Sequence, residues 1–148
     1  MLSHPSVSSI PSMVSTELRN LGVGVSAGLF VLPTVLECPV CQTSNVHSES
    51  AEGELCRHCR CDLGVLWEIQ GAAADHLVQA GDAMALEDAK GTFSHALRSW
   101  EMVHSIQSAA VAALASAMLG ETATVHVWIQ EMRKLRSGGN SRLDSHRR

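Results

Sequence analysis

Aromatic residues are scarce in this chain of 148 residues, which contains no tyrosine, two phenylalanines and three tryptophans. The hydrophobic content of 45% is nevertheless ordinary for a globular protein. Most of the apolar residues are Ala, Leu and Val, and this composition favours closely packed helices over a β-sandwich or a β-barrel.

The motifs of the common catalytic sites are also missing. The sequence has no Gly-rich phosphate loop, no nucleophile elbow and no His-Glu-x-x-His motif. No regular spacing gathers the histidines of the predicted helices, which are His76, His95, His104 and His126. We therefore expect a protein that is not an enzyme.

Positive charge is limited as well. The formal net charge is −4, and only residues 137–148 carry a net positive charge. Without a broad basic face the chain has little to attract a phosphate backbone, so we do not expect a nucleic-acid partner. We predict that the basic tail, residues 137–148, is disordered, because it begins with Ser and two glycines.

One continuous apolar run, LGVGVSAGLFVLPTVL, occupies residues 21–36. It is short for a membrane helix and contains three glycines and a proline, and Arg19 is the only basic residue before it. Residues 1–20 are Ser-rich and predicted to be disordered. We interpret residues 1–36 as an arm whose apolar part packs against the helices or a partner, with a signal peptide as the alternative.

Five cysteines lie within a short stretch, from Cys38 to Cys61. Four of them form two Cys-x-x-Cys pairs separated by fourteen residues: Cys38 and Cys41, then Cys56 and Cys59. Two such pairs can direct four thiolates at one tetrahedral ion, and zinc is the ion that such a site usually holds. Because four cysteines would leave no open coordination position, we expect Zn²⁺ in a structural role, in the reducing environment of the cytoplasm.

The segments CPVCQTSN and CRHCRCDL resemble the paired knuckles of a zinc ribbon, which we place at residues 37–63. The resemblance implies that Cys38, Cys41, Cys56 and Cys59 are the ligands. The residue after each pair is commonly Gly in this family, because the turn favours a positive φ; here it is Gln42 and Arg60, which predicts strained or differently shaped knuckles. Iron in a rubredoxin-like site is the alternative. Such sites are surrounded by aromatic residues, and this chain has almost none, so zinc is favoured.

Cys61 follows the second pair closely and has three possible roles. It can replace a neighbouring ligand, pair with one as a redox switch, or be a small half-buried residue. His58 lies between two ligands, and we expect its ring to face water.

Helical periodicity begins at Leu63 and predicts four antiparallel helices over residues 64–136, joined into two hairpins. The predicted helices are residues 63–79, 82–99, 101–119 and 122–136. Glycines mark the ends of the first and third. We expect Trp67 to pack the ribbon against these helices.

The Gly81–Asp82 joint, followed by Ala89, Phe93 and Ala96, resembles the second half of a tetratricopeptide repeat, in which small residues let paired helices approach closely. The spacing after the joint is longer here than in that family. Two such hairpins can hardly shield a core alone, so we expect the chain to oligomerise or to dock on a protein partner.

The sequence thus predicts a mainly α protein with a small zinc ribbon before the helices. We expect it to be an adaptor or assembly protein that binds a protein partner or itself. The alternatives are a nucleic-acid-binding zinc ribbon and a redox sensor that uses Cys61.

Overall fold

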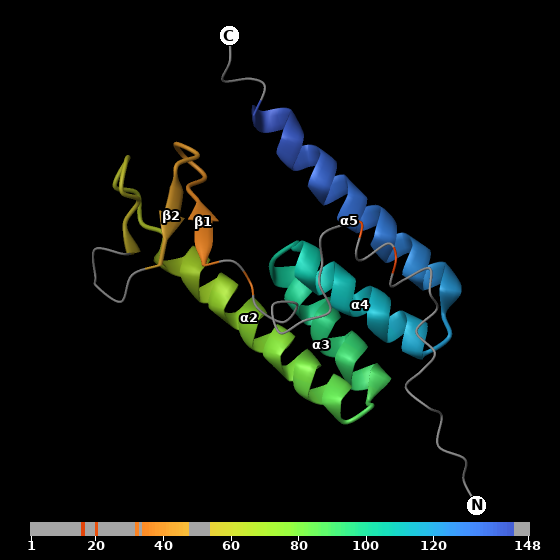
Figure 1. Cartoon of the computed structure of the whole chain (residues 1–148). Coiled ribbons are helices and arrows are strands. Elements are labelled where there is room, and N and C mark those ends of the chain that lie inside the picture. Colours follow the sequence, from red (N-terminus) through yellow and green to blue (C-terminus); the bar gives the residue numbers. More distant parts are fainter. Residues whose placement is uncertain (1–15, 17–19, 21–31, 33, 48–53, 144–148) are drawn as a thin grey trace, which may run out of the picture.

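A computed structural model describes Thr16, Asn20, Leu32, residues 34–47 and residues 54–143. In these residues a small antiparallel hairpin precedes four helices, which confirms the mainly α prediction (Figure 1). The elements are β1 (Val35–Glu37), β2 (Ser44–Val46), α2 (Gly64–Ala85), α3 (Ala89–Met102), α4 (Ile106–Met118) and α5 (Thr122–Leu143).

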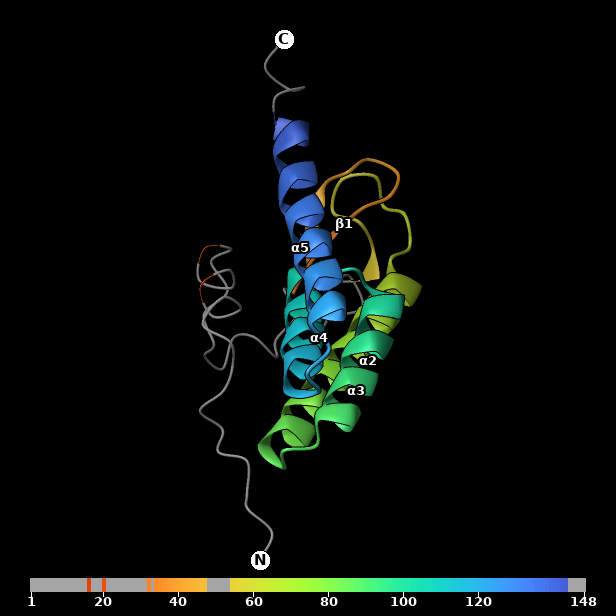
Figure 2. The ribbon, with the colours of Figure 1, turned by 90° about the vertical axis from the view of Figure 1, so that its right-hand side faces the viewer.

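The four helices form a row in which each packs mainly against its neighbours in the chain. The contacts run from α2 to α3, from α3 to α4 and from α4 to α5, whereas α2 and α4 touch only slightly. Figures 1 and 2 show this arrangement from two sides, with the β-hairpin beside the first turns of α2. The described helices are therefore an open array rather than a closed bundle.

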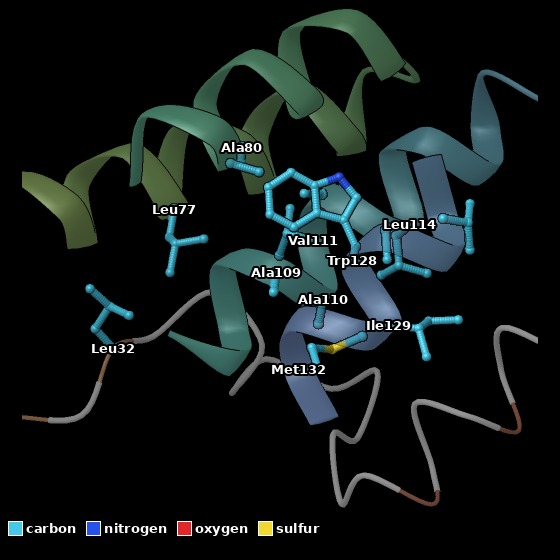
Figure 3. Packing of buried hydrophobic residues seen from close by; sticks show 14 of the residues in the cluster. Leu32, Leu77, Ala80, Ala109, Ala110, Val111, Leu114, Trp128, Ile129 and Met132 are labelled. Atoms are coloured by element: carbon cyan, nitrogen blue, oxygen red, sulfur yellow. The ribbon is translucent and has the colours of Figure 1, made fainter. Parts of the chain in front are cut away.

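Helix α4 is the centre of the core. Residues 108–116 are all buried, because this segment consists only of Ala, Val, Leu and Ser and can approach neighbours on every side. Buried side chains of the other helices complete the cluster, among them Leu77 of α2, Ala96 of α3 and Trp128 and Met132 of α5 (Figure 3).

Leu32, in the N-terminal arm, is part of this core. Its side chain is only 5% exposed and belongs to the same cluster as Leu77. A second described residue of the arm, Asn20, accepts a hydrogen bond at its carbonyl oxygen from Arg136 Nη1 of α5 at 2.7 Å. Leu32 thus lies where the expected packing of the apolar part of the arm, residues 21–36, would place it, whereas Asn20 belongs to the segment that was expected to be disordered; most other residues of the arm lie outside the described residues.

The joint between α2 and α3 differs from the sequence prediction. Gly81 and Asp82 lie inside α2, so the Gly-Asp joint that carried the tetratricopeptide resemblance is not a turn. The chain turns instead at Glu87, which has a φ of 58°, and Asp88 caps α3 by accepting a hydrogen bond from the Gly91 N–H at 2.9 Å. A Cβ on Gly91 would clash with the Asp88 carboxylate, so this glycine serves the cap.

The last two helices also differ at their ends. Helix α4 begins after Ser105, whose side chain caps the Ser108 N–H, rather than at residue 101. The expected stop near Gly120 is confirmed, with a φ of 76° there. The prediction of a disordered tail from residue 137 is wrong for residues 137–143, because α5 continues to Leu143. Elongation adds one hydrogen bond per residue, so two glycines weaken an established helix without ending it.

We predict that Leu32→Ala lowers the free energy of unfolding by about 2–4 kcal/mol, because the substitution leaves a cavity in the core beside Leu77. Leu86→Ala is the matched control: Leu86 is 81% exposed, so its loss should change stability by less than about 0.5 kcal/mol. Chemical unfolding of the two variants measures the difference. Equal stability of both variants would contradict the assignment of Leu32 to the core.

Candidate metal centre

The first knuckle is the turn between β1 and β2. The Cys38 N–H donates to the Thr43 carbonyl at 3.0 Å, and the Gln42 N–H donates back to the Cys38 carbonyl at 2.8 Å. The flanking pair Glu37 and Ser44 closes the antiparallel ladder. Cys38 and Cys41 are thereby held on the inside of one tight turn.

The second knuckle repeats this pattern. The Cys56 N–H donates to the Cys61 carbonyl at 2.8 Å, and the Arg60 N–H donates to the Cys56 carbonyl at 2.9 Å. A bridge between Leu55 and Asp62 takes the place of the pair that flanks the first knuckle. The two turns are equivalent, so Cys61 occupies the position that Thr43 has in the first.

Both knuckles adopt a positive φ without glycine. Gln42 has a φ of 60° and Arg60 a φ of 62°, in the left-handed region that L-residues rarely occupy. Of the two outcomes expected, strained or differently shaped knuckles, the structure has the positive φ that glycine would adopt, a conformation that is strained for these two side chains. The closing hydrogen bonds of each knuckle hold the residue there.

The four predicted ligands converge. The sulfur atoms of Cys38, Cys41, Cys56 and Cys59 all lie within 4.8 Å of one another. Across the knuckles, Cys38 Sγ is 3.5 Å from Cys59 Sγ, and Cys41 Sγ is 3.5 Å from Cys56 Sγ. A tetrahedral zinc ion with Zn–S bonds of about 2.3 Å separates its sulfurs by about 3.8 Å, so the donor set fits such an ion closely.

The same geometry perturbs the thiol pKa values. The backbone N–H of Cys59 lowers the pKa of Cys56 to about 5, against the opposing effect of burial. In the first knuckle the backbone N–H of Cys41 likewise lowers the pKa of Cys38. The backbone N–H of Cys61 lowers the pKa of Cys59, but burial and contacts with neighbouring thiols outweigh it and raise that pKa. The first cysteine of each knuckle thus favours the thiolate that a metal binds.

Asn45 supports the site from inside and was not singled out by the sequence. Its buried side chain donates to the Thr43 carbonyl at 2.7 Å and accepts from the Arg57 N–H at 2.9 Å, so it links the two knuckles. Its Nδ2 also lies 3.7 Å from Cys56 Sγ. Nothing in the polar insert distinguishes this asparagine from the other polar residues around it.

Two residues connect the four-cysteine cluster to the helices. Leu63 and Trp67, at the start of α2, are buried in one cluster with Cys38 and Cys56. The Trp67 ring also meets the His47 ring edge-on, with centroids 5.1 Å apart. The prediction that Trp67 packs the ribbon against the helices is confirmed.

The two remaining residues of interest lie beside the cage. His58 is exposed, as expected. Cys61 is half-buried, and its sulfur is 3.2 Å from Cys38 Sγ, outside the group of four.

The structure brings together one pair of helical histidines. His76 Nδ1 and His95 Nδ1 are 3.4 Å apart, across α2 and α3. His104 stacks on Trp100, and His126 Nδ1 contacts the Thr122 carbonyl. Within the described residues, the four cysteines are the one group of three or more potential metal ligands.

Comparison of the chain with protein-family models, curated proteins and solved structures finds no match. No described helix is both long enough and apolar enough to cross a membrane. The geometry of the site and of the helices therefore carries the functional argument.

We predict that Gln42→Gly and Arg60→Gly each stabilise the metal-loaded protein by roughly 0.5–1 kcal/mol, because glycine adopts a positive φ without steric strain. Val40→Gly, in the first knuckle but without a positive φ, should be destabilising. Chemical unfolding of the three variants tests this. If all three lose stability equally, the two left-handed positions are not strained.

Proposed function

We propose that this protein is a non-enzymatic zinc-ribbon adaptor or assembly module of the cytoplasm. A structural zinc ion fixes the ribbon, and the helical array binds a protein partner or a second copy of the chain. The observation that carries the proposal is the four-cysteine cage, built on two equivalent knuckles and packed directly onto the first turns of α2.

Zinc is favoured by the chemistry of the donors. Four thiols in a tetrahedral arrangement suit zinc, and iron is the rival for the same donor set. Rubredoxin-like iron sites are surrounded by aromatic residues, whereas Trp67 is the one Phe, Tyr or Trp residue in the described buried cluster around these cysteines. This favours zinc. Four protein ligands would occupy every position around the ion, so its role is structural rather than catalytic.

The ion would supply most of the stability of the ribbon. Strands β1 and β2 have three residues each, and a hairpin of this size is at best marginal in water. Structural zinc contributes roughly 10 kcal/mol or more of binding free energy in comparable small domains. Through Leu63 and Trp67 this contribution also reaches the start of α2.

A helical face is the favoured binding surface. Val65 and Ile69 of α2 are exposed and lie one turn apart, so they share one side of the helix. The open row of helices does not fold this side into its own core, and paired apolar side chains of this kind suit a helix-packing partner.

We predict one zinc ion per chain on gently purified protein, and loss of the zinc in Cys38→Ser and Cys59→Ser, because each variant removes a ligand from the cage. Elemental analysis and native mass spectrometry of the same sample measure this. Ser44→Ala, on the exposed side of β2, is the control and should keep its zinc. Bound iron, or a metal-free protein with oxidised cysteine pairs, would contradict a structural zinc site.

We predict that the double substitution Val65→Glu and Ile69→Glu weakens association by at least about tenfold, because it places charge on an apolar contact. Light scattering over a range of protein concentrations reports self-association. Val78→Glu, at another exposed position of α2, is the matched control and should associate like the unmodified protein. Unchanged association of the double variant would exclude this face as the interface.

A further inference from the structure

Cys61 is the point at which the two knuckles differ. In the first knuckle the equivalent residue is Thr43, whose hydroxyl accepts a hydrogen bond from Cys41 Sγ at 3.3 Å, within the same turn. In the second knuckle a thiol stands at this position, and it lies against Cys38, a ligand of the opposite turn. The departure from the first knuckle thus places a fifth sulfur across the cage.

The sulfur of Cys61 lies closer to Cys38 Sγ than Cys59 Sγ does. Its distance to Cys38 Sγ is 3.2 Å, against 3.5 Å between Cys38 and Cys59 and between Cys41 and Cys56. Cys61 is also partly accessible, whereas Cys38 is buried. An oxidant in solution therefore meets Cys61 before it meets its neighbour.

We propose that Cys61 is a site of oxidation by peroxides, and that it then forms a disulfide with Cys38 and opens the metal cage. In the first step the Cys61 thiol takes one oxygen from hydrogen peroxide and becomes a sulfenic acid, with release of water. In the second, Cys38 sulfur attacks Cys61 sulfur, the S–O bond breaks, and the hydroxyl leaves as a second water after taking up a proton. Two sulfurs give up two electrons in total, and one peroxide accepts them.

Cys38 is the partner because the backbone already presents it. Cys61 is held by its carbonyl hydrogen bond with the Cys56 N–H and by the neighbouring Leu55–Asp62 bridge. A disulfide to Cys59 would close over the single residue Arg60 and distort the second knuckle. A disulfide to Cys38 joins the two knuckles where they already face each other.

This bond removes one ligand from the proposed zinc site, so this consequence rests on the proposed function; the sulfur pairing itself does not. A cage with three remaining thiolates holds the ion less tightly. Cys38 shares a buried cluster with Leu63 and Trp67, so oxidation also acts on the start of α2.

The test uses the metal-loaded full chain, hydrogen peroxide, and two variants, Cys61→Thr and Cys61→Ser. Cys61→Thr installs the residue that the first knuckle has at this position. Both variants should first be shown to hold one zinc and to unfold like the unmodified protein. Zinc release into a chromogenic chelator and peptide mapping of disulfides are then followed together.

The expected result is a Cys38–Cys61 cross-linked peptide in the unmodified protein, formed in step with zinc release, and release about tenfold slower in both variants. Equal release rates in all three proteins would overturn the proposal, as would a disulfide that joins other cysteines. Loss of zinc in Cys61→Ser before any oxidant is added would make Cys61 a ligand and would also overturn it. If the protein holds no zinc, the structural zinc site fails, and the peptide map alone decides the pairing.

Discussion

The ribbon depends on one geometric constraint: its two equivalent turns must face each other. Each turn is closed by two backbone hydrogen bonds and sets its cysteines on the inner side, and Asn45 links one turn to the other. The sulfurs meet within 4.8 Å only because both turns keep the same shape, including a positive φ at Gln42 and Arg60. The positive φ at these two positions, which glycine would adopt without strain, is thus a condition for the site.

The helical array depends on a different constraint: its helices must approach α4 closely. Helix α4 carries small side chains on all sides, so α3 and α5 can pack against it on two sides and Leu32 can reach the same core. Larger side chains enter from its neighbours, with Trp128 meeting Trp100 edge-on at 5.4 Å. The scarcity of aromatic residues is therefore compatible with a dense core, because Phe93, Trp100 and Trp128 pack against one another and against the small residues of the cluster.

The sequence predicted the site better than the joints of the helices. Cysteine spacing identified the four residues that converge, since each pair is held by one short local turn. Helical periodicity found four helices, but glycine misplaced their ends: Gly81 lies inside α2 and Gly138 inside α5. The true turn uses Glu87 and Asp88, and the Asp88 cap is a local signal; the Gly81–Asp82 pair offered a similar signal six residues earlier, and that pair lies inside α2. Asn45 acts through its contact with the Arg57 N–H, twelve residues away, which no local pattern reports.

The two constraints meet at the start of α2. The ribbon has too little sheet to be stable by itself, and its buried cysteines share a cluster with Leu63 and Trp67. The same helix continues into the core through Leu77 and packs along α3. A change in the cage therefore alters the packing of a helix that also carries the exposed residues Val65 and Ile69. The proposed metal binding, thiol oxidation and association would in this way be linked through one element, since the cage, Cys61 and the exposed pair all lie at or beside the first turns of α2.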